Sequence, residues 1–210
     1  MVTAKVLISN TVVKQGKLPP RERILAAARE LFYRDGIRAV SVDTVAAAAQ
    51  TNKMTLYRHF ASKDALVSIY LRQLAAEGDS VWETLRQEYP HDPQARLLAL
   101  LRKVSQFGDE CSGRGCALAN AAVELAERRH PARKIIETHK RQQRERLVRL
   151  CREAGYARPQ RLADEIFLLL EGARMSLQSV GRQGPGAHLF AMASELLAAA
   201  SRRHSKTRAI

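Results

Sequence analysis

Between residues 53 and 63 the sequence gathers side chains that suit contacts with phosphates and with the edges of bases. The hydroxyls of Thr55 and Tyr57 are donors for phosphate oxygens, and Lys63 adds a positive charge shortly after them. Lys53 and Arg58 carry the donors that pair with guanine acceptors in the major groove of DNA. These residue types at this spacing predict a surface that reads double-stranded DNA.

Two short helices joined by a tight polar turn, over residues 42–61, would position these side chains. The small residues Ala46–Ala49 allow the first helix to pack closely on the second, and Gln50–Asn52 would form the turn. Leu56 and Phe60 would face inward from the second helix. The N-terminal half of that helix would then face the groove, where the helix dipole also favours phosphate.

The composition of the chain favours helices over strands. Of the 210 residues, 46% are hydrophobic and only 5% are aromatic, a balance that supports a packed helical core. Helical periodicity continues to about residue 204, and no strand pattern or repeat interrupts it. We therefore expect an all-α fold of about nine helices.

The sequence contains no segment that is typical of a membrane or secreted protein. No apolar run approaches the roughly 20 residues that a membrane span needs, and Val6–Ile8 is too short a patch for a secretory signal. The three cysteines, an odd number, argue against a disulfide scaffold. We expect a cytoplasmic protein without a membrane partner.

The formal net charge of +14 favours a polyanionic partner, but the excess charge lies away from residues 42–61. Residues 128–152 hold ten Lys and Arg against two Asp and Glu. This stretch fits a solvated helix face. It also fits an electropositive rim that attracts an anionic ligand or assists DNA binding at long range.

The run Thr55–Phe60, followed by Ser62–Leu66, resembles the TetR family of one-component transcription regulators. The positions that precede the run match as well: Ala27, Leu31, Phe32, Gly36, Val45 and Ala46. The resemblance spans roughly residues 20–70, and its motifs are highly specific. It implies an all-α homodimer with an N-terminal three-helix DNA-binding domain and a C-terminal ligand-binding and dimerisation domain.

This resemblance sets the expected domain boundaries and the residues at DNA. We expect a basic tail at 1–18, the DNA-binding domain at 19–79, the ligand-binding and dimerisation domain at 80–204 and a tail at 205–210. By resemblance, Thr55, Tyr57 and Lys63 would contact phosphates. Lys53, Met54 and Arg58 would lie nearest the bases. The expected DNA-binding residues are Thr44, Lys53, Met54, Thr55, Tyr57, Arg58, His59 and Lys63.

The sequence departs from the family at the turn, where the family usually has glycine and this chain has Gln50. Glycine at such a position relieves the strain of a positive φ. Gln50 therefore implies either tolerated strain or a slightly different turn.

The last two apolar helices are the expected dimer interface, and a palindromic operator follows from a symmetric dimer. The interface residues that we expect are Leu162, Ile166, Leu169, Leu170, Ala173, Leu177, Leu189, Met192 and Leu196. The alternative is packing of these helices within one chain.

We expect the protein to be a repressor that a small-molecule effector of unknown identity releases from its operator. The residues that we expect to line its pocket are Trp82, Phe107, Cys116, Asn120, Glu124 and His139. An alternative is a redox- or electrophile-sensing regulator, because Cys111 and Cys116 flank Arg114 in a glycine-rich loop and a nearby cation lowers a thiol pKa.

Catalysis is not expected. The sequence has no phosphate-binding loop, nucleophile elbow or paired acid–base set. His130 and His139 lack ligand-like spacing with the thiols, so neither a metal nor a cofactor is expected.

Overall fold

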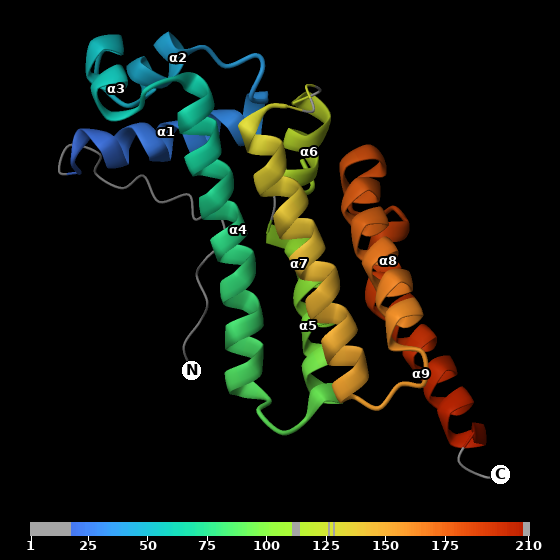
Figure 1. Cartoon of the computed structure of the whole chain (residues 1–210). Helices are drawn as coiled ribbons and strands as arrows, with labels where there is room; N and C mark the ends of the chain where they lie inside the picture. Colours follow the sequence, from blue (N-terminus) through green and yellow to red (C-terminus); the bar gives the residue numbers. More distant parts are fainter. Residues whose placement is uncertain (1–17, 111–113, 126, 128, 208–210) are drawn as a thin grey trace. The chain divides into compact units, whose positions relative to one another are not determined.

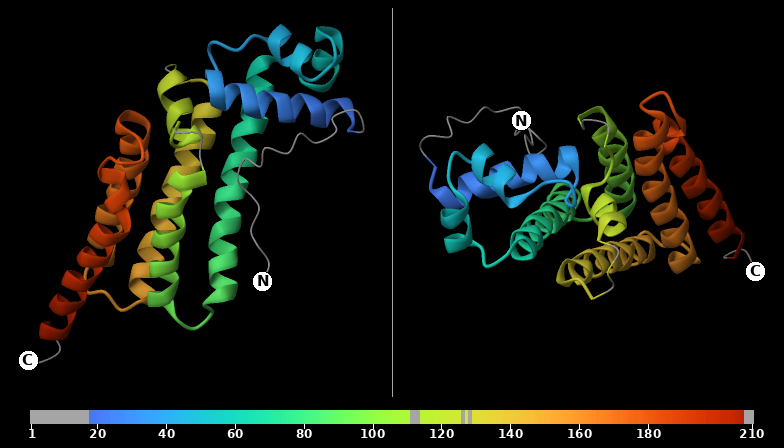
Figure 2. Two further views of the ribbon diagram at one scale, coloured as in Figure 1. Left: turned by 180° about the vertical axis from the view of Figure 1, so that it is seen from behind. Right: turned by 90° about the horizontal axis from the view of Figure 1, so that it is seen from above.

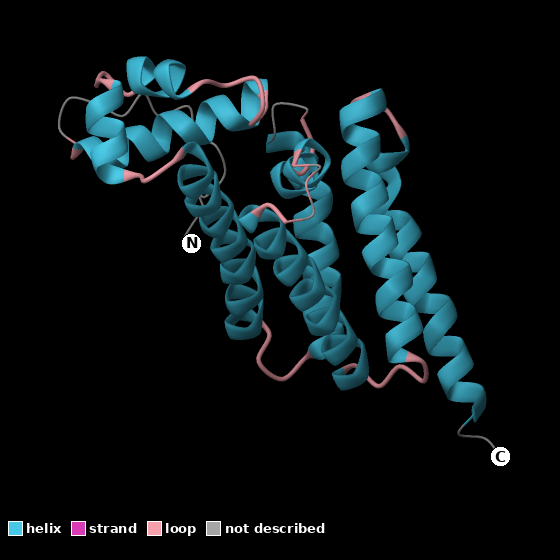
Figure 3. Cartoon of the chain, turned by 45° about the horizontal axis from the view of Figure 1, so that its top comes forward, coloured by secondary structure: helices cyan, strands magenta, loops and turns pink. Residues whose placement is uncertain are grey.

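The structure is a computed structural model that describes residues 18–110, 114–125, 127 and 129–207 (Figure 1). Within those ranges the chain forms nine α-helices and a short 3₁₀ helix, with no strand, which confirms the all-α prediction (Figure 3). The helices are α1 (Pro20–Asp35), α2 (Val42–Ala48), α3 (Lys53–His59), α4 (Lys63–Glu88), α5 (Pro93–Glu110), α6 (Ala117–Glu124), α7 (Pro131–Glu153), α8 (Pro159–Val180), η2 (Pro185–His188) and α9 (Leu189–Thr207). The side chains of 107–110 and 201–207, and almost all of the expected tail at 1–18, lie outside the description.

The chain divides into two compact units. Unit 1 contains residues 1–77 and 116–137, and unit 2 contains residues 78–115 and 138–210. The first division falls between residues 77 and 78, and residues 116–137 join the N-terminal helices rather than the C-terminal part. The physical reason is that apolar residues of α6, Leu118 and Ala121, are buried in the core of unit 1.

In unit 1, α1, α2 and α3 pack against one another (Figure 2). Pro20 occupies the first turn of α1, where its missing N–H costs nothing, and Ile24 and Ala28 on its inner face are fully buried. The Ser41 hydroxyl caps α2 by accepting from the Thr44 N–H at 3.0 Å. These three helices form the scaffold that holds residues 42–61.

Polar contacts fasten the other segments of unit 1 to this scaffold. Arg29 on α1 forms a bidentate ion pair with Glu77 at the end of the unit's part of α4. A carboxylate oxygen of Glu124, the last residue of α6, accepts from the Arg38 N–H at 2.9 Å. The same carboxylate lies 3.0 Å from where a Cβ on Gly36 would stand, and Gly36 has a φ of +92°. The α1–α2 connection is therefore fixed by a side chain far away in the sequence.

In unit 2, segments of α4 and α5 share one hydrophobic core with α7, α8 and α9. Leu85, Leu97, Leu101, Leu147 and Ile166 are fully buried there. Helices α8 and α9 run side by side in both views of Figure 2. In the described part of the chain, no helix is both long enough and apolar enough to cross a membrane.

Candidate functional sites

The turn between α2 and α3 places Gln50 in the left-handed region, with a φ of 52°. The Thr51 N–H donates to the Ala46 carbonyl at 2.9 Å, and the Gln50 N–H donates to the Ala47 carbonyl at 3.0 Å. This pair of bonds is a Schellman motif, whose left-handed residue is usually glycine. Of the two readings of this departure from the family, the structure shows the tolerated strain.

Replacing Gln50 by glycine should stabilise the protein. Relief of the left-handed strain is worth about 1–2 kcal/mol, and the greater freedom of an unfolded glycine offsets about 0.5–1 kcal/mol of it. We expect Gln50→Gly to raise the free energy of unfolding in urea by about 0.5 kcal/mol. Gln142→Gly, on the exposed face of α7, should instead lower it; two changes of the same sign would contradict the argument.

Helix α3 is held by its apolar side and presents its polar side to solvent. The Asn52 side chain caps it, accepting from the Thr55 N–H at 2.8 Å, while Leu56 and the following Phe60 are buried. Met54 is 74% exposed and Tyr57 44% exposed. Arg58 and His59 are exposed too, so the expected DNA-contacting positions lie on the free side of the helix.

Lys53 is less available for a base than the sequence indicates. Its Nζ lies 3.1 Å from Oδ2 of Asp43 on α2. The hydrogen bond that Lys53 donates to Asp43, and then the negative charge of that carboxylate, raise the pKa of Lys53. Sequence reasoning missed this pair, because the partners lie ten residues apart on two different helices and no local spacing reveals their contact.

Lys63 begins α4, shortly after the end of α3. The preceding Ser62 hydroxyl accepts from the Ala65 N–H at 3.0 Å and so caps this helix. Partial burial lowers the pKa of Lys63, against the opposing charges of Asp64 and Glu124. Unit 1 thus presents the exposed side of α3 together with the capped, basic start of α4.

Comparison with known proteins decides the family. The family profile described as "Bacterial regulatory proteins, tetR family" matches residues 24–68, which cover α1, α2, α3 and the start of α4. A TetR-family transcriptional regulator from Streptomyces coelicolor has the same fold, with a TM-score of 0.79 at 25% identity, over 89% of this chain and 96% of that one. Residues 24–68 therefore belong to the TetR family, and the chain has the fold of a TetR-family regulator.

Similarity to curated relatives covers only part of the chain. The HTH-type transcriptional regulator UidR of Escherichia coli is 40% identical over 55 residues, 26% of this chain and 28% of UidR. The HTH-type transcriptional repressor DhaR of a Mycobacterium species is 24% identical over 110 residues, 52% of this chain and 54% of DhaR. The match therefore spans between about a quarter and a half of these relatives.

The expected dimer residues divide into two groups in the structure. Leu162, Ile166, Leu170 and Leu189 are buried in the core of unit 2 within a single chain. These four residues pack within one chain, because the faces of α8 and α9 that carry them share one core with residues of α5 and α7. The partly or largely exposed members of the expected set are Leu169, Ala173, Leu177, Met192 and Leu196.

A different stripe of α8 is exposed, and sequence reasoning missed it. Leu168 is 69% exposed and Met175 is 52% exposed. Gly172 stands between them, and nothing lies within 4 Å of the position of its Cβ. The spacing of four and three residues places all three on one helix face. The sequence shows that α8 is apolar on more than one face. Its periodicity does not show which of these faces is buried and which is exposed.

The six expected pocket residues fall in both units and have different surroundings. Trp82 is among the residues that line a hollow in unit 2. Glu124 instead holds the backbone of Arg38, and His139 is buried beside Gly78 and Asp79. The side chain of Phe107 lies outside the described residues. Cys116 precedes α6 and packs against the core of unit 1 together with that helix, which also carries Asn120.

The cysteines give little support to thiol sensing. Cys111 lies outside the described residues, and Cys116 is partly buried. Burial raises the pKa of Cys151 to about 12, so this thiol is a poor nucleophile. Among the described side chains, no group of three or more His, Cys, Asp or Glu could hold a metal ion.

Four of the ten cations in residues 128–152 are engaged in contacts within their own units. Lys140 pairs with Glu171 at 2.6 Å, Arg144 pairs with Asp164 at 2.5 Å, and Arg146 pairs with Asp79. In unit 1, Arg133 donates to the Leu125 carbonyl at 2.8 Å. Several of these cations therefore tie helices together, which neither sequence interpretation of the stretch had included.

His139 should make the stability of the protein depend on pH. Burial lowers its pKa most; Asp79 opposes this, and Lys140, Arg146 and Arg174 add to it. The unfolded chain then binds more protons, so stability is full above the unfolded pKa of about 6.5 and is lost as pH falls below it. We expect His139→Gln to flatten the fall of the urea-unfolding free energy between about pH 6.5 and 5. An equally steep fall in the variant would contradict the argument.

Proposed function

We propose that the protein is a homodimeric transcriptional repressor that binds a palindromic operator and is released from it by a small-molecule effector. One observation carries the DNA-binding part. Leu56 and Phe60 fix α3 in the core of unit 1, while Tyr57 and Arg58 are exposed and Lys63, at the capped start of α4, is partly exposed. This arrangement offers hydrogen-bond donors to a groove and positive charge to its phosphates.

The exposed apolar stripe of α8 supports the dimer. Leu168 and Met175 are large apolar side chains in water, and Gly172 between them allows a second helix to approach closely. A symmetric dimer formed through this face would carry two copies of α3. Recognition helices about 34–36 Å apart read successive major grooves, hence an inverted repeat.

Release by an effector requires that the ligand bind one state of the dimer better than the other. The shift cannot exceed this differential affinity. The name of the relative DhaR supports repression. Nothing observed at Cys116 favours the redox alternative over a small-molecule effector.

The test is selection of DNA from a random pool by the purified full-length protein, followed by fluorescence anisotropy. An inverted repeat should be enriched; recovery of no symmetric sequence would overturn the proposal. Tyr57→Phe removes one hydroxyl per subunit and should weaken binding about 10–100-fold without changing the salt slope. Lys63→Gln should reduce the slope of log K against log salt by about 2 for the dimer. Tyr156→Phe, in unit 2, is the control and should bind normally.

A further inference from the structure

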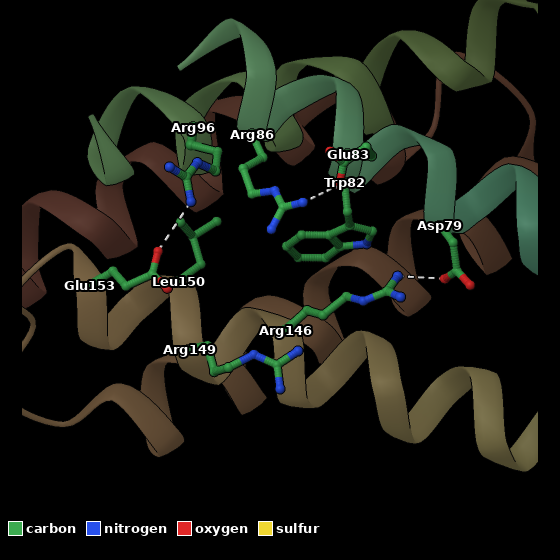
Figure 4. Close-up of a pocket in the computed structure, with 9 residues that line it drawn as sticks. All are labelled: Asp79, Trp82, Glu83, Arg86, Arg96, Arg146, Arg149, Leu150 and Glu153. Carbon is green, nitrogen blue, oxygen red and sulfur yellow. Dashed lines mark hydrogen bonds and ion pairs between the residues drawn. The ribbon is translucent and has the colours of Figure 1, made fainter. Parts of the chain in front are cut away.

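Unit 2 contains a hollow of about 300 Å³ between the end of α4, the start of α5 and the last turns of α7 (Figure 4). We call it the Trp82 pocket. It is lined by Asp79, Trp82, Glu83, Arg86, Arg96, Arg146, Arg149, Leu150 and Glu153. Its volume is at the lower end of the range of small-molecule sites, which suits a ligand of one or two rings.

Four arginines and three carboxylates line the Trp82 pocket, so the arginines outnumber the carboxylates by one. Each carboxylate has an arginine: Asp79 pairs with Arg146, Glu83 pairs with Arg86 at 2.7 Å, and Glu153 pairs with Arg96 at 3.1 Å (Figure 4). For Arg149, by contrast, the described part of the chain provides neither an ion-pair nor a hydrogen-bond partner. Arg149 is exposed, so its guanidinium is available to an anion that enters the hollow.

The paired arginines differ in how many donors they keep. Arg96 donates to the carbonyls of Tyr89 and Pro90 as well as to Glu153, so it is committed to the α4–α5 connection. Arg146 and Arg86 each direct a single nitrogen at their carboxylates. Since a guanidinium has five N–H groups, these two side chains retain donors for a second acceptor beside Arg149.

The apolar part of the wall is flat and fixed. The indole Nε1 of Trp82 donates to Oε1 of Gln143, which holds the ring plane, and Leu150 adds an aliphatic surface. Figure 4 shows Trp82 among the guanidinium side chains that extend from α4 and α7. A fixed aromatic face next to several guanidinium groups suits a planar ring that carries an acid group.

We propose that the Trp82 pocket binds an aromatic carboxylate, with Arg149 as its principal cationic partner and Trp82 as its stacking surface. The site would supply the ligand class of the effector, and this regulatory consequence rests on the proposed function. Binding itself does not, because it requires only unit 2 of the intact chain.

The chain provides its own reporter, because Trp82 is its single tryptophan. The probe is 4-nitrobenzoate, whose nitroaromatic ring quenches indole emission on contact. We expect saturable quenching of Trp82, a matching isotherm by calorimetry, and at least tenfold weaker binding of neutral 4-nitrobenzyl alcohol. Equal affinity for acid and alcohol would overturn the anion site. Inorganic phosphate that binds as tightly as the acid would overturn the aromatic class.

Arg149→Gln should weaken 4-nitrobenzoate binding at least tenfold, and Arg149→Lys should recover part of the loss because it keeps the charge. Both variants should fold, because Arg149 holds no other side chain in place. The matched control is Arg152→Gln, at an exposed arginine of the same helix that does not line the pocket, and it should bind normally. Unchanged affinity in Arg149→Gln would remove the proposal.

A second arm separates the pocket from its regulatory role. Selected operator DNA, bound to the full-length protein, is titrated with 4-nitrobenzoate while anisotropy is followed. Release that is lost in Arg149→Gln supports an effector site. Quenching without release upholds the pocket and overturns its role as an effector site, whereas failure to select any operator counts against the proposed function alone.

Discussion

Leu168→Arg is expected to convert the proposed dimer into a monomer and to abolish operator binding at nanomolar concentrations. The substitution places two unpaired guanidinium groups, one from each subunit, at an apolar contact. Burial of a charge without a partner costs several kcal/mol, so the dimer dissociation constant should rise by roughly three orders of magnitude or more. Sedimentation velocity measures the change in association directly.

The control for this experiment is Leu98→Arg. Leu98 is also a leucine in unit 2 with an exposed side chain, but it lies on α5 rather than on the stripe of α8. It should remain dimeric and bind DNA. A dimeric Leu168→Arg variant would show that the subunits associate through another surface, and the assignment of the stripe would then be withdrawn.

Leu56→Ala is expected to destabilise unit 1 more than any other single truncation in α3. Leu56 is 0% exposed, and within α3 it is the buried residue that anchors seven residues of helix to α1 and α2. Truncating a fully buried leucine leaves a cavity and costs about 3 kcal/mol. Urea unfolding followed by circular dichroism should show this loss in the transition that involves unit 1.

Met54 provides the matched control in the same helix. Its side chain is 74% exposed, so Met54→Ala should change the unfolding free energy by less than about 0.5 kcal/mol. It can still weaken DNA binding if the side chain lies near the bases. Equal destabilisation by the two substitutions would mean that α3 is not held by Leu56.

Much of unit 1 could be predicted because its signals are local. Ser41, Asn52 and Ser62 are caps whose hydrogen bonds reach three residues ahead, and each stands where its helix begins. The positive φ of Gln50 is also local, since the length of the turn determines it. These features depend on neighbours in sequence, which is why the prediction of residues 42–61 agrees with the structure.

The remaining features depend on partners that sequence spacing does not reveal. Leu162 and Ile166 are as apolar as Leu168, and the pattern did not show which face of α8 would meet α5 and α7. The carboxylates that pair with the cations of α7 also lie far away in the sequence. Asp79, for example, is 67 residues from Arg146. Glu124 is among the expected pocket residues, whereas its acceptor role at Arg38 follows only from the packing of α6.

The ion pair between Lys53 and Asp43 bears on how the protein would distinguish one DNA sequence from another. A cation that carries its own anion is close to neutral as seen by the phosphate backbone, so it adds little to sequence-independent attraction. Both side chains are largely exposed, so the pair is weak and can exchange partners. On the proposed function, we expect Lys53 to turn from Asp43 to a guanine edge in a matching operator and to stay paired with Asp43 on other sequences.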